Sequence, residues 1–176
     1  AELPLEVLLH LRRHRALGTA CLAGAVLLPL GWPHGWLTPR PSPYKELSLA
    51  LTVPDARVVA ERHGPVGPVT VVAGPTVPFR WAPGQSLMVE EESPEQLAVF
   101  TDGSGMTAIT RFDGDLERLR YLDGQTAALP FRLRSQPRVL VLGAGGGADV
   151  LLARLFAAPS IDAVELNPQM VELVRG

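Results

Sequence analysis

The fold is decided by the stretch Arg138-Val-Leu-Val-Leu-Gly143-Ala144-Gly145-Gly146-Gly147-Ala148-Asp149. Its apolar run ends at Leu142 and predicts a strand buried on both faces, as in a parallel sheet. The glycines that follow predict a tight turn in which the backbone can approach a ligand closely. Residues 149–156 then carry apolar side chains at helical spacing, and residues 161–164 predict a second short strand that ends at Glu165. The fold class that we expect is therefore α/β.

This order of elements is typical of the opening unit of a site for a nucleotide-type cofactor. Backbone N–H groups in the turn and at the helix N-terminus can face a polar or anionic ligand, because no Cβ stands in the way. Glu165 lies 20 residues beyond Gly145 (165 − 145), where the next parallel strand would bring a carboxylate to a ribose diol. Asn167-Pro168 predicts that the next helix begins at once, with an N-cap residue followed by proline. The alternative is an ordinary α/β unit that uses glycine only for packing.

The composition restricts the class of protein. The chain has 176 residues, enough for one ordinary domain or two small ones, and a formal net charge of −2, which argues against a nucleic-acid binder. A single cysteine, Cys21, excludes an internal disulfide framework and fits a reducing compartment such as the cytoplasm. The histidines lie scattered without partners at ligand spacing, so we predict no metal site.

The N-terminal region combines a basic cluster with an apolar run. Residues 3–15 are apolar and then basic, and residues 16–30 are almost wholly apolar. This pattern is typical of the flank of a membrane helix, although the run is short of the roughly 20 residues that span a bilayer and Pro29 closes it. Two interpretations stay open, a membrane-proximal segment and a packed or disordered leader. We assign residues 1–41 to this leader and to a proline-rich linker.

The middle of the chain is predicted to be rich in β-structure. Residues 57–62 and 69–72 flank a turn of glycine and proline and predict a hairpin, and further short strands are expected at residues 77–80, 87–90, 97–101 and 107–112. Residues 44–53 fit either a strand or a short helix, and residues 115–133 are expected to be mostly helical. We therefore expect a β-rich module over 42–114, followed by a connecting helix and the first part of a cofactor domain over 115–176.

Several motifs, in order along the chain, are similar to those of the spermidine synthase family of polyamine aminopropyltransferases. They are Ser42-Pro-Tyr44-Lys45, Phe100-Thr-Asp102-Gly103, Tyr121-Leu-Asp123 with a later Leu129-Pro130, the glycine turn after Val139, and Val164-Glu165-Leu-Asn167. The family has Ser-x-Tyr-Gln, Leu-Asp-Gly, Tyr-His-Glu, a glycine-rich cofactor loop and Val-Glu-Ile-Asp at the corresponding places. The resemblance covers roughly residues 42–175 and is nearest to bacterial spermidine synthase-like proteins that carry membrane helices ahead of the transferase part.

The resemblance implies a small N-terminal antiparallel β module on a parallel sheet like that of class I S-adenosylmethionine-dependent methyltransferases, which is Rossmann-like. It implies decarboxylated S-adenosylmethionine or S-adenosylmethionine as the cofactor, no metal, and transfer of an aminopropyl group to a small amine such as putrescine. The implied cofactor-binding residues are Gly143, Ala144, Gly145, Gly146, Gly147, Glu165 and Leu166. The implied contacts to substrate or cofactor are Tyr44, Asp102, Tyr121 and Asp123.

The resemblance also implies a homodimer through the β module and a membrane tether, on the cytoplasmic face of a bacterial membrane, through the N-terminal region. The family's catalytic aspartate follows a later strand, so we expect it beyond Gly176 and expect this chain alone to be inactive.

Three departures from the family leave other functions open. This chain has Lys45 where the family has glutamine, Leu122 where the family has histidine, and Gly146 where the glycine loop of the family has aspartate. One alternative is a non-catalytic nucleoside-binding or interaction module of the same fold, and another is an S-adenosylmethionine-dependent methyltransferase. A further alternative is an NAD-binding oxidoreductase, because Gly143-x-Gly145-x-x-Ala148 also fits the dinucleotide fingerprint.

Overall fold

The computed structural model describes residues 5–31 and 41–175, and the chain divides into two compact units, Ala1–Arg40 and Pro41–Gly176. The first unit contains one long helix, α1 (Leu5–Gly31), of 27 residues. Its second half exposes large apolar side chains, among them Leu22, Val26 and Leu27. Within the described residues, no helix combines the length and the apolar character that crossing a membrane requires.

The second unit begins with a four-stranded antiparallel sheet in the order β1-β2-β3-β4. Its strands are β1 (Arg57–Arg62), β2 (Val69–Ala73), β3 (Gln96–Thr101) and β4 (Ser104–Thr110). The predicted hairpin of residues 57–62 and 69–72 is confirmed by the pairing of β1 with β2. The ambiguous segment before Pro54 is helical, as α3 (Glu46–Ala50).

Helical turns connect this sheet to a second, parallel pair of strands. The connection contains the 3-10 helices η1 (Leu116–Gly124) and η2 (Thr126–Ala128) and the helix α4 (Leu129–Leu133). The parallel part follows as β5 (Arg138–Leu142), α5 (Ala148–Leu155), β6 (Ser160–Val164) and α6 (Pro168–Arg175). The strand, turn, helix, strand and helix expected at the end of the chain are therefore confirmed, and the connection is helical as predicted, largely in 3-10 form.

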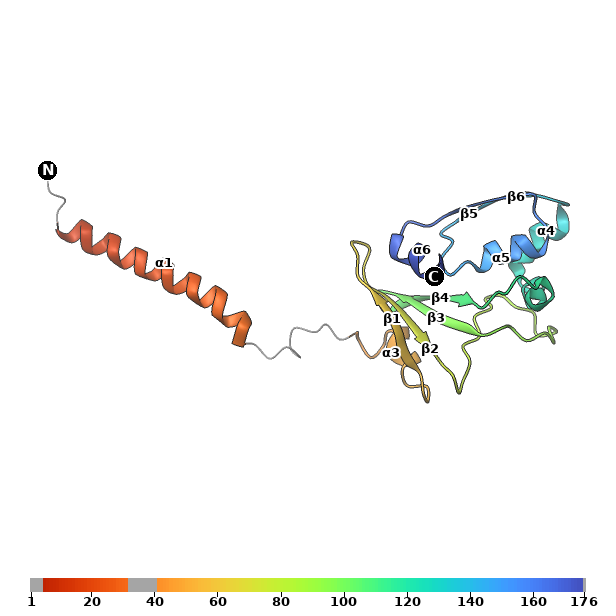
Figure 1. The fold of residues 1–176 in the computed structure, drawn as a ribbon, viewed down its shortest axis with the longest axis horizontal. Helices are drawn as coiled ribbons and strands as arrows, with labels where there is room; N and C mark the ends of the chain where they lie inside the picture. The colour runs from red at the N-terminus through yellow and green to blue at the C-terminus, as the bar shows by residue number, and fades with distance from the viewer. Residues whose placement is uncertain (1–4, 32–40, 176) are drawn as a thin grey trace. The chain divides into compact units, whose positions relative to one another are not determined.

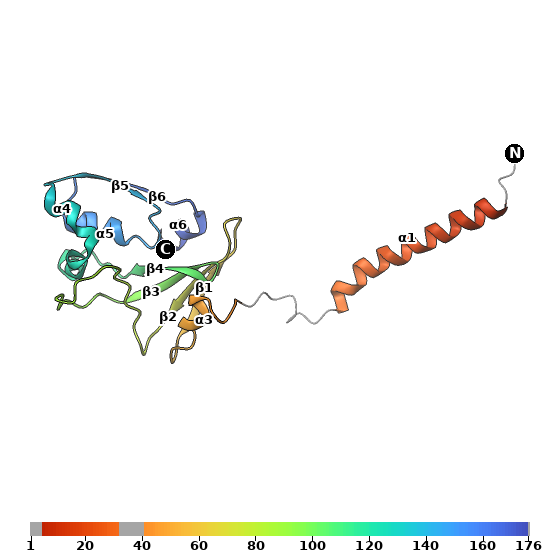
Figure 2. The ribbon, with the colours of Figure 1, turned by 180° about the vertical axis from the view of Figure 1, so that it is seen from behind.

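Within this second unit the helices α5 and α6 lie between the two sheets, as both views show (Figures 1 and 2). Met170 of α6 packs on one face of the antiparallel sheet, against Val69, Val71 and Val99. Leu47 of α3 packs on the opposite face, against Val72, Ala98 and Phe100. Successive side chains of β2 and β3 point to opposite faces of the sheet, so each face packs its apolar side chains against a different helix. A third cluster joins η1 to α5 through Leu119, Tyr121, Leu122 and Leu152.

Two of the expected strands are absent from the sheet. Residues 77–80 and 87–90 form no strand in the described part of the chain. Within the first segment, Pro78 removes a backbone donor that a ladder needs. Directly after this segment, the backbone N–H of Trp81 donates to a side chain and not to a strand: the acceptor is Oε1 of Gln96, at 2.7 Å. In the second segment Leu87 and Met88 are exposed and have no sheet neighbour to pack against.

The strand β5 is buried on one face only, which corrects the expectation of two covered faces. Val141 is buried toward the helices, whereas Leu140 and Leu142 are 61% and 75% exposed. Val164 lies opposite Leu142 in the parallel register and is exposed as well. The physical reason is that α5 and α6 cover the same side of a sheet that has only these two strands.

Candidate functional site

The glycine turn and Glu165 meet at the carboxyl ends of β5 and β6. The two strands run parallel with Leu142 opposite Val164, so Gly143 and Glu165 leave the sheet at the same edge. The backbone N–H groups of Gly143 and Ala144 donate to the carbonyl of Val164 at 2.8 and 3.1 Å and tie the turn to β6. Gly147 is the N-cap of α5 with φ at +90°, a conformation that favours glycine. The sequence therefore builds the turn that was expected, with α5 starting directly from it.

The carboxylate of Glu165 is held by two backbone donors. Its Oε2 accepts from the N–H of Gly145 at 2.9 Å, and its Oε1 accepts from the N–H of Asn167 at 2.8 Å. Asn167 in turn caps α6, because its Oδ1 accepts from the N–H of Gln169 at 3.1 Å. A carboxylate has about four lone-pair sites, so Glu165 keeps acceptor capacity for the hydroxyl groups of a ligand. Leu166, which was expected to contact the cofactor, is 82% exposed.

The strand β4 contacts the glycine turn at Gly146. The hydroxyl of Thr107 accepts from the N–H of Gly146 at 3.2 Å. A Cβ on Gly146 would lie 1.9 Å from the carbonyl oxygen of Ala108, so only glycine permits this approach. The N–H groups at residues 143–147 all have partners within the chain. A ligand would therefore bind the N–H groups of Gly145 and Gly146 by replacing Glu165 or Thr107.

A cavity of about 660 Å³ lies beside this turn. Its walls come from β4, the glycine turn, α5, the end of β6, and α6. Apolar side chains dominate the lining, including Ile109, Phe112 and Leu151, and Glu165 contributes a charged group. Such a cavity suits a flat apolar ring with a few polar groups at its edge.

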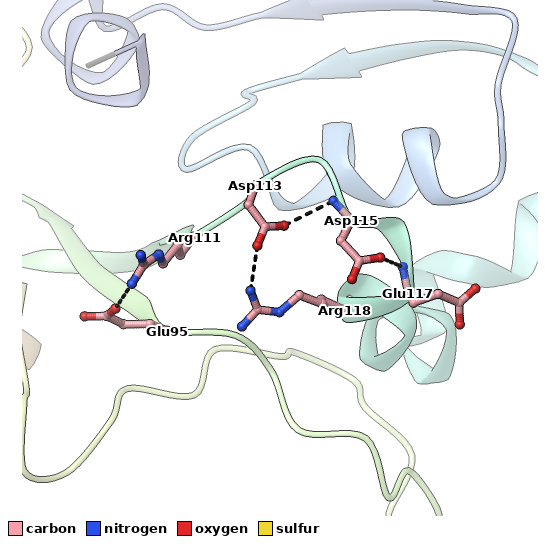
Figure 3. Close-up of polar contacts among 6 residues, drawn as sticks. All are labelled: Glu95, Arg111, Asp113, Asp115, Glu117 and Arg118. Carbon is pink, nitrogen blue, oxygen red and sulfur yellow. Dashed lines mark hydrogen bonds and ion pairs between the residues drawn. The ribbon is translucent and has the colours of Figure 1, made fainter.

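Phe112 lines this cavity, and polar contacts hold the residues on either side of it. Figure 3 shows these contacts. The carboxyl of Asp113 accepts from Arg118 at 2.7 Å and from the backbone N–H of Asp115 at 3.1 Å. These two contacts, the backbone donor first, lower the pKa of the Asp113 carboxyl below its ordinary value of 3.8. Arg111 on the other side of Phe112 pairs with Glu95 at 3.2 Å. The guanidinium of Arg154 lies 5.1 Å from the centre of the Phe112 ring, within cation–π range.

The remaining expected contact residues do not line the cavity. Tyr44 is 92% exposed. Asp102 pairs with Lys45 at 2.8 Å and Asp123 pairs with Arg132, so both take part in local ion pairs. Tyr121 is fully buried, and its hydroxyl lies 3.3 Å from both Gln96 and Thr110. Thr110 lines the cavity, so Tyr121 supports a wall residue from behind.

The sequence reasoning missed the contribution of β4 to the site. Thr107, Ile109 and Phe112 belong to a segment that was expected to be a strand, but nothing in its pattern signals contact with the glycine turn. The close approach becomes visible only in the structure, where a Cβ on Gly146 would meet the backbone of Ala108. In the described ranges 5–31 and 41–175, no group of three or more histidine, cysteine, aspartate or glutamate side chains is arranged to hold a metal ion.

Comparison of the chain with family models, with curated proteins and with solved structures found no match. Any function assigned to the site therefore depends on its own residues. The contacts of Glu165 and the lining of the cavity carry that argument.

Proposed function

We propose that this chain forms the cofactor half of a group-transfer site of spermidine synthase type, which binds an S-adenosylmethionine-type ligand. The observation that supports the proposal most is the position of Glu165. It lies at the carboxyl end of β6, is held by the glycine turn, and lines a largely apolar cavity. Parallel α/β sheets bind nucleoside ligands at this edge.

The residues fit an adenosyl group in two respects. Glu165 keeps lone pairs for the two hydroxyls of a ribose, because each of its oxygens accepts one backbone hydrogen bond. Ile109, Phe112 and Leu151 offer an apolar wall to the adenine ring. When bound, an adenosylsulfonium supplies a carbon activated by a good leaving group. The chain's own part is to orient that group and to exclude water from it.

The acceptor in this proposal is a small amine such as putrescine. Glu165 is the carboxylate that lines the cavity, and its oxygens are already held by backbone donors. A general base for the amine would therefore come from outside the described lining. Binding of the cofactor and activation of the amine therefore need separate experiments.

Calorimetric titration with methylthioadenosine, S-adenosylmethionine and NADH tests the cofactor half. We expect the adenosyl-sulfur ligands to bind the unmodified chain and to lose most of their affinity in Glu165→Ala. Glu172→Ala is the matched control, because Glu172 is an exposed carboxylate of α6 that does not line the cavity. Binding of NADH with no binding of the adenosyl-sulfur ligands would replace the proposal with a dinucleotide-binding oxidoreductase.

A non-catalytic module of the same fold is the second candidate. It is favoured by the local contacts of the residues expected on the amine side: Lys45 pairs with Asp102, and Leu122 is buried where the family has histidine. Release of methylthioadenosine from decarboxylated S-adenosylmethionine in the presence of putrescine separates the two, and it is measured on the full-length protein because this chain alone is expected to be inactive. Turnover supports the transferase, and binding without turnover supports the non-catalytic module.

We also propose that the N-terminal unit tethers the protein to the cytoplasmic face of a membrane. Residues 12–15 contain Arg12, Arg13 and Arg15, and the helix then exposes Leu17, Leu22 and Leu27. Arginines beside exposed apolar side chains favour an anionic bilayer surface. Sedimentation with vesicles that contain anionic lipid tests this, and equal recovery of Leu22→Glu with the vesicles would contradict it.

A further inference from the structure

The cavity beside the glycine turn is bordered by the free edge of β4. This strand is an outer strand of its sheet and pairs with β3 on one side. Ile109 and Thr110, at its end, line the cavity. The carbonyl oxygen of Ala108 lies against Gly146, where a Cβ would approach it to 1.9 Å, so the edge also meets the glycine turn. Backbone groups on this edge can therefore contact a ligand in the cavity.

The register of the sheet gives the direction of the backbone groups of Thr110. Thr110 lies opposite Gln96, so the next residues along the two strands are Arg111 and Glu95. The N–H of Arg111 donates to the carbonyl of Glu95 at 2.8 Å. Antiparallel partners alternate between hydrogen-bonded and non-hydrogen-bonded pairs, so Thr110 and Gln96 form a non-hydrogen-bonded pair. The N–H and the carbonyl of Thr110 therefore point away from β3, toward the free edge.

These two backbone groups are available to a ligand. Among the described residues, no hydrogen bond outside the strand ladders involves the N–H or the carbonyl of Thr110. The side chain is occupied elsewhere, because its hydroxyl accepts from Nε2 of Gln96 at 3.1 Å and lies 3.3 Å from the hydroxyl of Tyr121. Thr110 is 8% exposed, and a shielded backbone donor or acceptor without a partner costs free energy. A ligand that supplies both partners therefore gains affinity.

We propose that the backbone of Thr110 binds the base edge of the adenosyl ligand, with its carbonyl accepting from the 6-amino group and its N–H donating to the adjacent ring nitrogen. This inference rests on the proposed function and adds the determinant of base specificity. Adenine has the 6-amino donor beside the acceptor N7, whereas guanine has two acceptors, O6 and N7, on the same edge. The contact involves the base alone, so S-adenosylmethionine and its decarboxylated form are bound alike at this end.

Calorimetric titration of the unmodified chain compares methylthioadenosine with an analogue that has hydrogen in place of the 6-amino group. We expect the analogue to bind about tenfold more weakly, because the carbonyl of Thr110 is left without a donor. Thr110→Val removes the hydroxyl and keeps both backbone groups, so the preference for methylthioadenosine persists in this variant. Loss of the preference in a folded Thr110→Val protein assigns base recognition to the hydroxyl and overturns the inference.

Amide hydrogen exchange followed by NMR locates the contact on the unmodified chain. The N–H of Arg111 is the matched control, because it is bound to Glu95 before any ligand is added. We expect methylthioadenosine to slow exchange at Thr110 about tenfold more than exchange at Arg111, because the N–H of Thr110 gains an acceptor. Equal slowing at both residues means that the ligand stabilises the sheet as a whole, and it overturns the inference.

The outcomes separate this inference from the proposed function. If methylthioadenosine binds while its analogue binds equally well, or while the amide of Thr110 gains no protection, Thr110 does not bind the base and the adenosyl site stands. If methylthioadenosine does not bind at all, the proposed function and this inference are overturned together.

Discussion

Gly146 is a residue of the glycine turn that lies directly against the backbone of β4. A Cβ built there lies 1.9 Å from the carbonyl oxygen and 2.4 Å from the carbonyl carbon of Ala108. Backbone atoms of a paired strand cannot move aside as a side chain does, so a methyl group forces β4 and the glycine turn apart. The glycine that sequence reasoning assigns to cofactor binding is thus also required for packing.

Gly146→Ala is therefore expected to destabilise the protein by roughly 1–3 kcal/mol, the usual cost of overpacking. Urea unfolding followed by circular dichroism measures it. Gly64→Ala is the matched comparison, because a Cβ there meets only the flexible side chain of Gln169, at 2.3 Å. If Gly64→Ala costs as much as Gly146→Ala, the close approach of β4 to the turn is not what makes Gly146 necessary.

The glycine turn also shows how far single residues can be predicted from sequence. Glu165 and Gly145 were placed at one site from their spacing and the rule for parallel strands, and they are in hydrogen-bond contact. Tyr121 and Asp102 were expected to contact the ligand through family motifs, but neither lines the cavity: Tyr121 lies behind Thr110, and Asp102 pairs with Lys45. Spacing within one strand-turn-helix unit is fixed by local geometry. Contacts between distant motifs depend on tertiary packing, which one sequence does not reveal.

At the scale of elements, the carboxylates of Asp113 and Asp115 fix the connection from β4 to η1 through hydrogen bonds. Asp115 is the N-cap of η1 and accepts from the N–H of Glu117 at 3.0 Å. Asp113 precedes it and binds both Arg118 and the N–H of Asp115 (Figure 3). This arrangement turns the chain sharply after Phe112, which lines the cavity. The acids therefore position a wall of the site without entering it.

Stability should depend on the ionisation of Asp113. Its pKa in the folded state lies below the ordinary value of 3.8 that the unfolded chain retains. The carboxylate therefore stabilises the fold fully above pH 3.8, and this contribution is lost as the pH falls through the lower folded pKa. We expect Asp113→Asn to lower the urea midpoint at pH 6 and the difference from the unmodified chain to shrink below pH 3.8.

Glu172→Gln serves as the control for this pH series, because the exposed Glu172 has no ion pair in the described structure. It should follow the unmodified chain at every pH. A gap between Asp113→Asn and the unmodified chain that stays constant down to pH 2 would show that the asparagine changes packing and not a titrating contact.

The elements that sequence patterns predicted well are those with clear boundaries. The hairpin of β1 and β2 and the helix after Asn167 both begin or end at turn and cap residues of known geometry. Residues 77–80 and 87–90 also lie between glycine, proline and acidic residues, yet they form no strand. Short apolar runs need a partner strand with free donors and acceptors, and directly after the first run the backbone N–H of Trp81 binds the side chain of Gln96 and no strand. Whether a short apolar segment finds a partner strand depends on the arrangement of the whole sheet, which the sequence of that segment does not specify.

At the scale of the whole second unit, the order of layers is sheet, helices, sheet, with the outer face of β5 and β6 open (Figure 1). The sequence of β5 predicts cover on both faces, because parallel strands in α/β proteins are usually covered on both. Neighbouring residues of this one strand therefore lie in opposite environments. Val141 is 7% exposed and faces the helices, whereas Leu142 is 75% exposed on the other side.

This contrast gives a prediction within a single strand. Val141→Ala removes buried methyl groups and should cost about 2 kcal/mol, at roughly 0.8 kcal/mol per buried methylene plus a cavity term. Leu142→Ala removes a larger side chain and should still change the free energy of unfolding by less than about 0.5 kcal/mol, as substitutions at exposed positions do. Urea unfolding of the two variants under one set of conditions measures both. If Leu142→Ala lowers the free energy of unfolding as much as Val141→Ala, a further layer covers the outer face of β5 in solution.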